Sequence, residues 1–267
     1  MSTYSVVALV TCIVLYISTA GSTAVPDLTS GRVQRTLGVG EQTVQSTISY
    51  VHYVTSPDMP KYQRSINKYL SNSIGSIWQD QPDHSTSELS REWYVGILAE
   101  FDSMYAHTDE VADGSHPWTL LDSTQITDPV IINGRPTELV QVYRTRYQFT
   151  GGAHGLPTTI SALFNRKTGD VVSFKELLQR NSRAFTSIAE RFFRKQQHIP
   201  ARRSLKGAGY WFPRGFHHND NIRFLPDSVE IIYNPYEIAP YVFGTITVRI
   251  PTLEVIPLLQ LPFSGQP

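Results

Sequence analysis

Two short stretches of the chain carry residue types that could bind or transform a ligand. The first is Gly151-Gly152-Ala153-His154-Gly155, in which glycines flank a single histidine. Glycine permits backbone angles and close approaches that a β-carbon forbids, so this segment could form a binding edge with His154 as a polar contact. It could instead be a tight crossing between strands, with His154 bonded to neighbouring backbone. No phosphate-binding lysine follows, and Pro157 precedes a β-branched run, which argues against a nucleotide loop.

The second stretch covers residues 234–241, Asn-Pro-Tyr-Glu-Ile-Ala-Pro-Tyr. Its prolines restrict φ, and rigid tyrosines next to glycine-rich loops favour contact with proteins or sugars. The same tyrosines could equally form corners of the core. We expect the two stretches to meet in space over one mixed core. The candidate ligand-binding residues are Gly151, Gly152, His154, Tyr236, Glu237 and Tyr241.

The sequence offers weak grounds for catalysis or metal binding. A hydrolase built on Glu237 would need a second carboxylate, and no motif supplies one; Gly-x-Ser-x-Gly is also absent. His217-His218 precedes Asp220, but adjacent side chains diverge and rarely chelate one ion. We therefore predict no catalytic residues, no metal site and no cofactor. The alternative is a hydrolase of envelope glycan that uses Glu237 and His154.

The composition is that of a folded protein without a polyanionic partner. The chain has 267 residues, of which 40% are hydrophobic and 17% charged, and its formal net charge is zero. A neutral chain gives no electrostatic reason to expect nucleic acid as a partner. The basic runs at residues 191–195 and 202–206 are interpreted as solvated surface.

The N-terminus predicts export. The apolar run of residues 6–18 would span about 20 Å as a helix, which suits a signal-peptide core better than a membrane crossing. We assign residues 1–24 to a signal peptide and place the protein in the periplasm or outside the cell. Because no Lys or Arg precedes the run, an uncleaved anchor is the alternative and the only expected membrane contact. Cys12 lies in the run and is the sole cysteine, so the exported protein would have no disulfide.

Helices and strands are expected in separate runs, which indicates an α+β fold with a mixed, mostly antiparallel sheet and two or three packed helices. Residues 25–42 are expected to form a tail and residues 198–221 an irregular segment. An N-terminal half, residues 43–150, and a C-terminal half, residues 151–259, are expected to form one compact unit. Expected strands are residues 43–54, 118–127, 128–132, 139–149, 158–165, 221–225, 229–234 and 241–250, and expected helices include residues 62–78, one after Ser85, one after Ser173 and residues 252–259.

The two stretches, with Phe164-Asn165 and Thr168-Gly169 between them, resemble an extracytoplasmic bacterial domain of unknown function. That domain forms the outer part of the lysozyme-sensing anti-sigma factor RsiV and precedes the catalytic domain of the peptidoglycan deacetylase PdaC. The resemblance covers residues 43–259 and is fainter in the N-terminal half. It implies an α+β fold outside the cytoplasmic membrane, and in the anti-sigma factor the domain binds lysozyme. The short segments before residue 6 and after residue 251 lead us to expect the binding module alone.

These observations favour an exported, non-catalytic binding module of the bacterial cell envelope. Its expected partner is a protein such as lysozyme, or peptidoglycan. Besides the glycan hydrolase, a structural envelope protein is an alternative, in which both stretches are only corners of the core.

Overall fold

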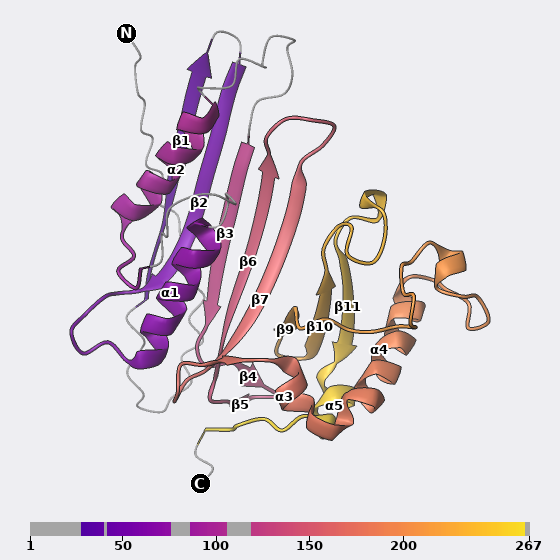
Figure 1. Cartoon of the computed structure of the whole chain (residues 1–267). Coiled ribbons are helices and arrows are strands. Elements are labelled where there is room, and N and C mark those ends of the chain that lie inside the picture. Colours follow the sequence, from indigo (N-terminus) through magenta and orange to yellow (C-terminus); the bar gives the residue numbers. More distant parts are fainter. Residues whose placement is uncertain (1–27, 40–41, 76–85, 106–118, 265–267) are drawn as a thin grey trace. The chain divides into compact units, whose positions relative to one another are not determined.

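The computed structural model describes residues 28–39, 42–75, 86–105 and 119–264 (Figure 1). The predicted signal peptide, with Cys12, and Ser85 of one expected helix cap lie outside these residues. No helix in the described ranges is long and apolar enough to cross a membrane. The chain forms two compact units, Met1–Gln125 with Arg146–Leu156, and Ile126–Thr145 with Pro157–Pro267.

The first unit contains a long β-hairpin and two helices. Strands β1 (Leu28–Val39) and β2 (Gln42–Tyr53) are antiparallel, and β3 (Thr119–Thr127) pairs in parallel with β2. Helix α1 (Lys61–Gly75) contacts β2, and α2 (Arg91–Tyr105) contacts both β1 and β2. The prediction of a tail over residues 25–42 was wrong. The small polar residues of this segment give little strand signal in the sequence. The segment is nevertheless a strand, because its backbone is hydrogen-bonded to β2 along the whole length of that strand.

The larger sheet has the strand order β1-β2-β3-β6-β7-β8 and is mostly antiparallel, which confirms the α+β prediction. Strands β6 (Leu139–Phe149) and β7 (Leu156–Asn165) match the expected runs, and β8 (Val171–Val172) is short. The long helices α1, α2 and α4 (Ser182–Gln196) have 15 residues each. In the first half of β6 both faces of the strand are buried, so buried and exposed residues do not alternate there.

The second unit adds a three-stranded antiparallel sheet. Its order is β11-β10-β9, built from β9 (Ile222–Phe224), β10 (Ser228–Tyr233) and β11 (Ile246–Pro251). The expected strand over residues 241–250 starts only at Ile246, because Tyr241–Phe243 form the 3-10 turn η3, which ends at Gly244 with φ 64°. The remaining elements are β4 (Ile131–Ile132), β5 (Arg135–Pro136), α3 (Phe174–Leu178), α5 (Thr252–Val255) and the 3-10 turns η1 (Gln179–Asn181), η2 (Lys206–Ala208) and η4 (Ile256–Leu258).

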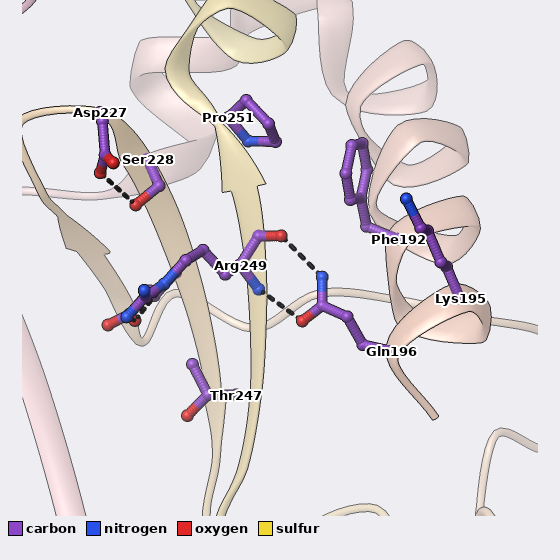
Figure 2. A pocket seen from close by; sticks show the side chains of 9 residues that line it. Phe192, Lys195, Gln196, Asp227, Ser228, Thr247, Arg249 and Pro251 are labelled. Atoms are coloured by element: carbon purple, nitrogen blue, oxygen red, sulfur yellow. Dashed lines mark hydrogen bonds and ion pairs between the residues drawn. The ribbon is translucent and has the colours of Figure 1, made fainter. Parts of the chain in front are cut away.

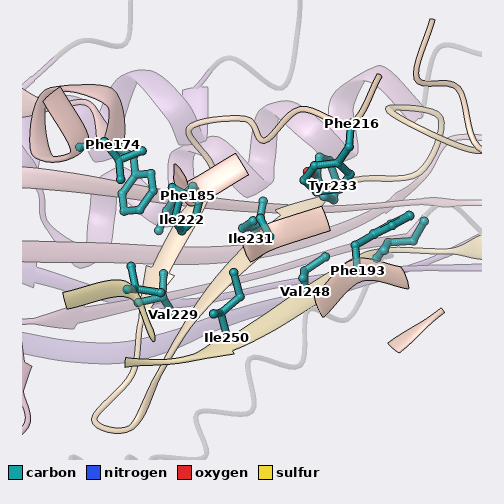
Figure 3. Packing of buried hydrophobic residues seen from close by; sticks show 14 of the residues in the cluster. Phe174, Phe185, Phe193, Phe216, Ile222, Val229, Ile231, Tyr233, Val248 and Ile250 are labelled. Carbon is teal, nitrogen blue, oxygen red and sulfur yellow. The ribbon is translucent and has the colours of Figure 1, made fainter. Parts of the chain in front are cut away.

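The core of the second unit lies between α4 and the three-stranded sheet (Figure 3). Residues 198–221 are irregular, as predicted, yet they contribute several aromatic rings to this core. The ring of Phe193 on α4 lies 4.8 Å from that of Tyr210, 5.6 Å from that of Phe212 and 5.3 Å from that of Phe216. These buried rings anchor the irregular segment to the helix.

Candidate functional site

The glycine segment forms the turn between β6 and β7. Gly151 and Gly152 have φ values of 98° and 92°, which other residues rarely adopt. A β-carbon on Gly155 would collide with the outer end of the Tyr147 ring, so a larger residue there would push this ring aside. The Nδ1 atom of His154 lies 3.3 Å from the Gly155 carbonyl oxygen. These features agree with the interpretation of a tight strand crossing with His154 next to neighbouring backbone.

In the second stretch, Glu237 closes a turn with its carboxylate. Its Oε2 accepts a hydrogen bond from the Asn234 backbone N–H at 3.0 Å, and its own N–H donates to the Asn234 carbonyl at 3.1 Å. Its Oε1 accepts from Asn219 Nδ2 at 2.6 Å. Tyr236, within the turn, has φ 69° and an exposed ring. Oε2 of Glu237 therefore closes the turn, and Oε1 ties the turn to Asn219.

Asn234 joins this turn to strand β7. Its Oδ1 accepts from the Thr159 N–H at 2.7 Å, and its Nδ2 donates to the Thr159 carbonyl at 3.0 Å. We call such a pair an amide bridge, because a side-chain amide offers the donor and acceptor that a neighbouring strand would offer. Asn221 adds a related pair, accepting from the Ser161 N–H at 2.7 Å and donating to the Thr159 carbonyl at 2.8 Å. Polar groups along the edge of β7 are thereby satisfied.

The same device covers both edges of the three-stranded sheet. Gln141 on β6 bridges the N–H and carbonyl of Phe224 on β9, at 2.6 and 3.2 Å. Gln196 on α4 bridges those of Arg249 on β11, at 3.0 and 2.7 Å. The bridge to Phe224 also explains how the polar side chain of Gln141 can be buried on β6.

The structure places the candidate residues in different units. Gly151, Gly152 and His154 belong to the first unit, whereas Tyr236, Glu237 and Tyr241 belong to the second. Within the second unit, the later stretch contacts β7 at Thr159, soon after the glycine turn. The expected meeting of His154 with Tyr236 stays a prediction.

A surface that the sequence predicted only in part, through Tyr236, Glu237 and Tyr241, lies on two loops of the second unit. We call residues 209–214 and 236–244 the aromatic loop pair. The backbone N–H of Trp211 donates to the Ile238 carbonyl at 2.7 Å, and the Tyr210 ring lies 5.2 Å from the Phe243 ring. These two contacts tie the loops together. Large apolar side chains nevertheless face solvent: Trp211 is 47% exposed, Tyr236 51%, Phe243 40% and Val242 85%.

The loop pair is closely fitted at Gly209. This residue has φ 95°, and a β-carbon there would lie 3.3 Å from the Phe243 ring. Within the 236–244 loop, the rings of Tyr236 and Tyr241 lie 5.7 Å apart. A tied loop that presents aromatic rings is suited to binding, since few conformations are lost when a ligand arrives. A sequence signal for Trp211 existed in its position between a glycine and Pro213 within an irregular segment.

An open cavity of about 770 Å³ lies between α4 and strands β10 and β11 (Figure 2). Phe192 and Lys195 line it from the helix, and Thr247 and Arg249 line it from the edge strand. Most polar groups that line the cavity are paired with one another. The Arg249 guanidinium donates to Glu230 Oε1 at 2.6 Å, and this hydrogen bond with the carboxylate charge raises the pKa of Arg249. With the amide bridge of Gln196 across its floor, the cavity is better explained as a covered sheet edge than as a ligand site.

The histidine pair contacts backbone and aromatic rings. His217 Nδ1 lies 3.4 Å from the Gly215 carbonyl oxygen, and the His218 ring lies edge-on to Phe185 at 5.0 Å. Across the described part of the chain, no group of three or more His, Cys, Asp or Glu residues is placed to hold a metal ion.

Comparison with known proteins indicates a family for part of the chain. Residues 174–252 match the model of a family described as "Protein of unknown function (DUF3298)", and no curated protein matches. A solved DUF3298 family member from Bacteroides fragilis is 17% identical, with a TM-score of 0.64; the match covers 88% of this chain and 94% of that one. A second, from Pseudomonas aeruginosa, is 16% identical, with a TM-score of 0.57 and the same coverage. The chain thus has the fold of these structures, and its matched residues include both loops of the aromatic loop pair.

Proposed function

We propose that this chain is an exported, non-catalytic binding module of the bacterial cell envelope, and that the aromatic loop pair contacts its partner. The partner is peptidoglycan or a protein such as lysozyme. The observation that carries this proposal is the exposure of Trp211, Val242 and Phe243 on two loops that are tied to each other and to the core.

Exposed apolar side chains gathered on fixed loops favour binding, because covering them removes apolar surface from water at little conformational cost. Trp and Tyr are the residues most often found to dominate binding energy at interfaces. Trp211 has an indole N–H in addition to its apolar ring, so it suits a partner that is polar at one point and apolar at another.

The finer family assignment belongs to this proposal. The resemblance to the outer domain of RsiV and the N-terminal region of PdaC suggests a location outside the cytoplasmic membrane. It also supports lysozyme and peptidoglycan as the first partners to test. The hydrolase alternative is less favoured because both oxygens of Glu237 already accept hydrogen bonds, one from Asn219 and one from the Asn234 backbone.

Calorimetric titration of the purified protein with lysozyme, and separately with soluble muropeptides, tests the proposal. We expect heat of binding with at least one ligand, and an affinity at least about tenfold lower for Trp211→Ala. Trp93→Phe, on α2 of the first unit, is the matched control and should bind as the wild type does. No heat with either ligand would remove the proposal. Turnover of cell-wall substrate that Glu237→Gln abolishes would support the hydrolase instead.

A further inference from the structure

Exposed cations lie on or next to the aromatic loop pair. Lys206 begins η2, the turn that leads directly to Gly209 and the Phe243 ring. Arg214 follows Trp211 in the same loop, between Pro213 and Gly215, which form a β-bridge. Both side chains are exposed. Trp211, the exposed aromatic residue of the 209–214 loop, is thus close in sequence to two positive charges.

The two cations have no side-chain partner in the described part of the chain, whereas the nearby carboxylate of Glu237 accepts hydrogen bonds. Among the described residues, neither Lys206 nor Arg214 makes a side-chain hydrogen bond or an ion pair. Glu237, the acidic residue of the loop pair, accepts hydrogen bonds from Asn219 and the Asn234 backbone. The irregular segment, residues 198–221, contains one acidic residue, Asp220, which is exposed. Glu237 is also exposed and keeps its negative charge, but its oxygens already accept hydrogen bonds, so the charged groups on or next to these loops that are open to pairing with a ligand are Lys206 and Arg214.

A partner must match both features. The C–H faces of sugar rings pack against aromatic rings, and carboxylates form charge-assisted hydrogen bonds with arginine and lysine. A cationic protein such as lysozyme would instead meet like charges at Lys206 and Arg214, which slows association and weakens binding. A neutral glycan would leave the cations unused.

Resting on the function proposed above, we propose that the aromatic loop pair binds an anionic saccharide. Sugar rings lie on Trp211 and Phe243, and ligand carboxylates pair with Lys206 and Arg214. Muropeptides have this chemistry, because their disaccharide carries a short peptide, joined through the lactyl group, that bears free carboxylates.

The test compares three soluble probes by calorimetry with the full chain. The probes are a disaccharide-tetrapeptide muropeptide, neutral chitohexaose and polyglutamate, which has carboxylates but no sugar rings. We expect the muropeptide to bind most tightly, with an affinity that falls as salt rises from low to physiological concentration. Trp211→Ala should weaken binding about tenfold, and Arg214→Gln and Lys206→Gln about threefold each.

Arg183→Gln is the matched control, because it removes one exposed positive charge from the opposite end of α4. It should leave the muropeptide affinity unchanged. Equal affinity for chitohexaose, or for polyglutamate, would overturn the anionic-saccharide assignment. Binding of lysozyme that Trp211→Ala weakens, with no muropeptide binding, would also overturn it while leaving the binding-module proposal intact. Failure of all probes and of lysozyme would remove both.

Discussion

The amide bridge from Asn234 to strand β7 should be a measurable source of stability. Asn234→Ala removes the partner of the Thr159 N–H, and Thr159 is only 9% exposed. The Thr159 carbonyl keeps a donor, because Asn221 Nδ2 lies 2.8 Å away. The substitution thus loses about 1 kcal/mol of net hydrogen bonding and leaves one largely buried N–H unsatisfied, at about 1–3 kcal/mol. We expect the free energy of unfolding to fall by about 2–4 kcal/mol.

Two further variants separate the bridge from a general loss of side chain. Asn234→Asp keeps an acceptor for the Thr159 N–H and should lose less stability than Asn234→Ala. Gln196→Ala removes the same pair of bonds from Arg249, at the open cavity where water can replace them. It should cost no more than about 1 kcal/mol.

Urea unfolding at pH 7, followed by far-UV circular dichroism, measures all three variants against the wild type. The reasoning is refuted if Asn234→Ala unfolds within about 0.5 kcal/mol of the wild type, or if it costs no more than Gln196→Ala. An unchanged slope with urea concentration is needed to assign the change to the folded state.

Other predictions concern the first unit, the turn and the fit of the loops. Burial lowers the pKa of His52 to about 4, so below about pH 6.5 the unfolded chain binds a proton at His52 that the folded protein does not bind. The free energy of unfolding should therefore decline by about 3 kcal/mol as pH falls from 6.5 to 4. His52→Gln should flatten this decline in urea unfolding measured as a function of pH. Glu237→Gln should lower the melting temperature, because the side chain loses its charge where the Asn234 N–H donates; an unchanged melting temperature would contradict the structural role. Gly209→Ala should destabilise the fold by about 1–2 kcal/mol and weaken ligand binding, because φ 95° is strained for alanine and the β-carbon crowds Phe243; unchanged urea unfolding and affinity would argue against this fit.

Local signals in the sequence predicted most of the elements. Asn133-Gly134 joins β4 to β5 with φ values of 49° and 73°. Ser173 with Glu176 forms a capping box on α3, the helix expected after Ser173. Both depend on residues close in sequence. Strand β1 depends on pairing with β2 along its length, and its own residues give no comparable signal.

The candidate site was predicted only in part, because it too depends on contacts between residues that are distant in sequence. Residues 234–241 stand out by composition, but the role of Asn234 requires Thr159, which is distant in sequence. Tyr210 is buried and Trp211 exposed, although both are aromatic and adjacent. Which of the two faces solvent depends on the packing of Phe193 and Phe243, and a single sequence does not contain that information.

The most direct test of the central claim is whether a ligand reaches Trp211. Tryptophan emission should change on addition of saturating muropeptide to the wild type and to Trp93→Phe, and should stay constant for Trp211→Phe. An emission change that persists in Trp211→Phe would show that the ligand binds elsewhere, which would contradict the assignment of the aromatic loop pair as the binding surface.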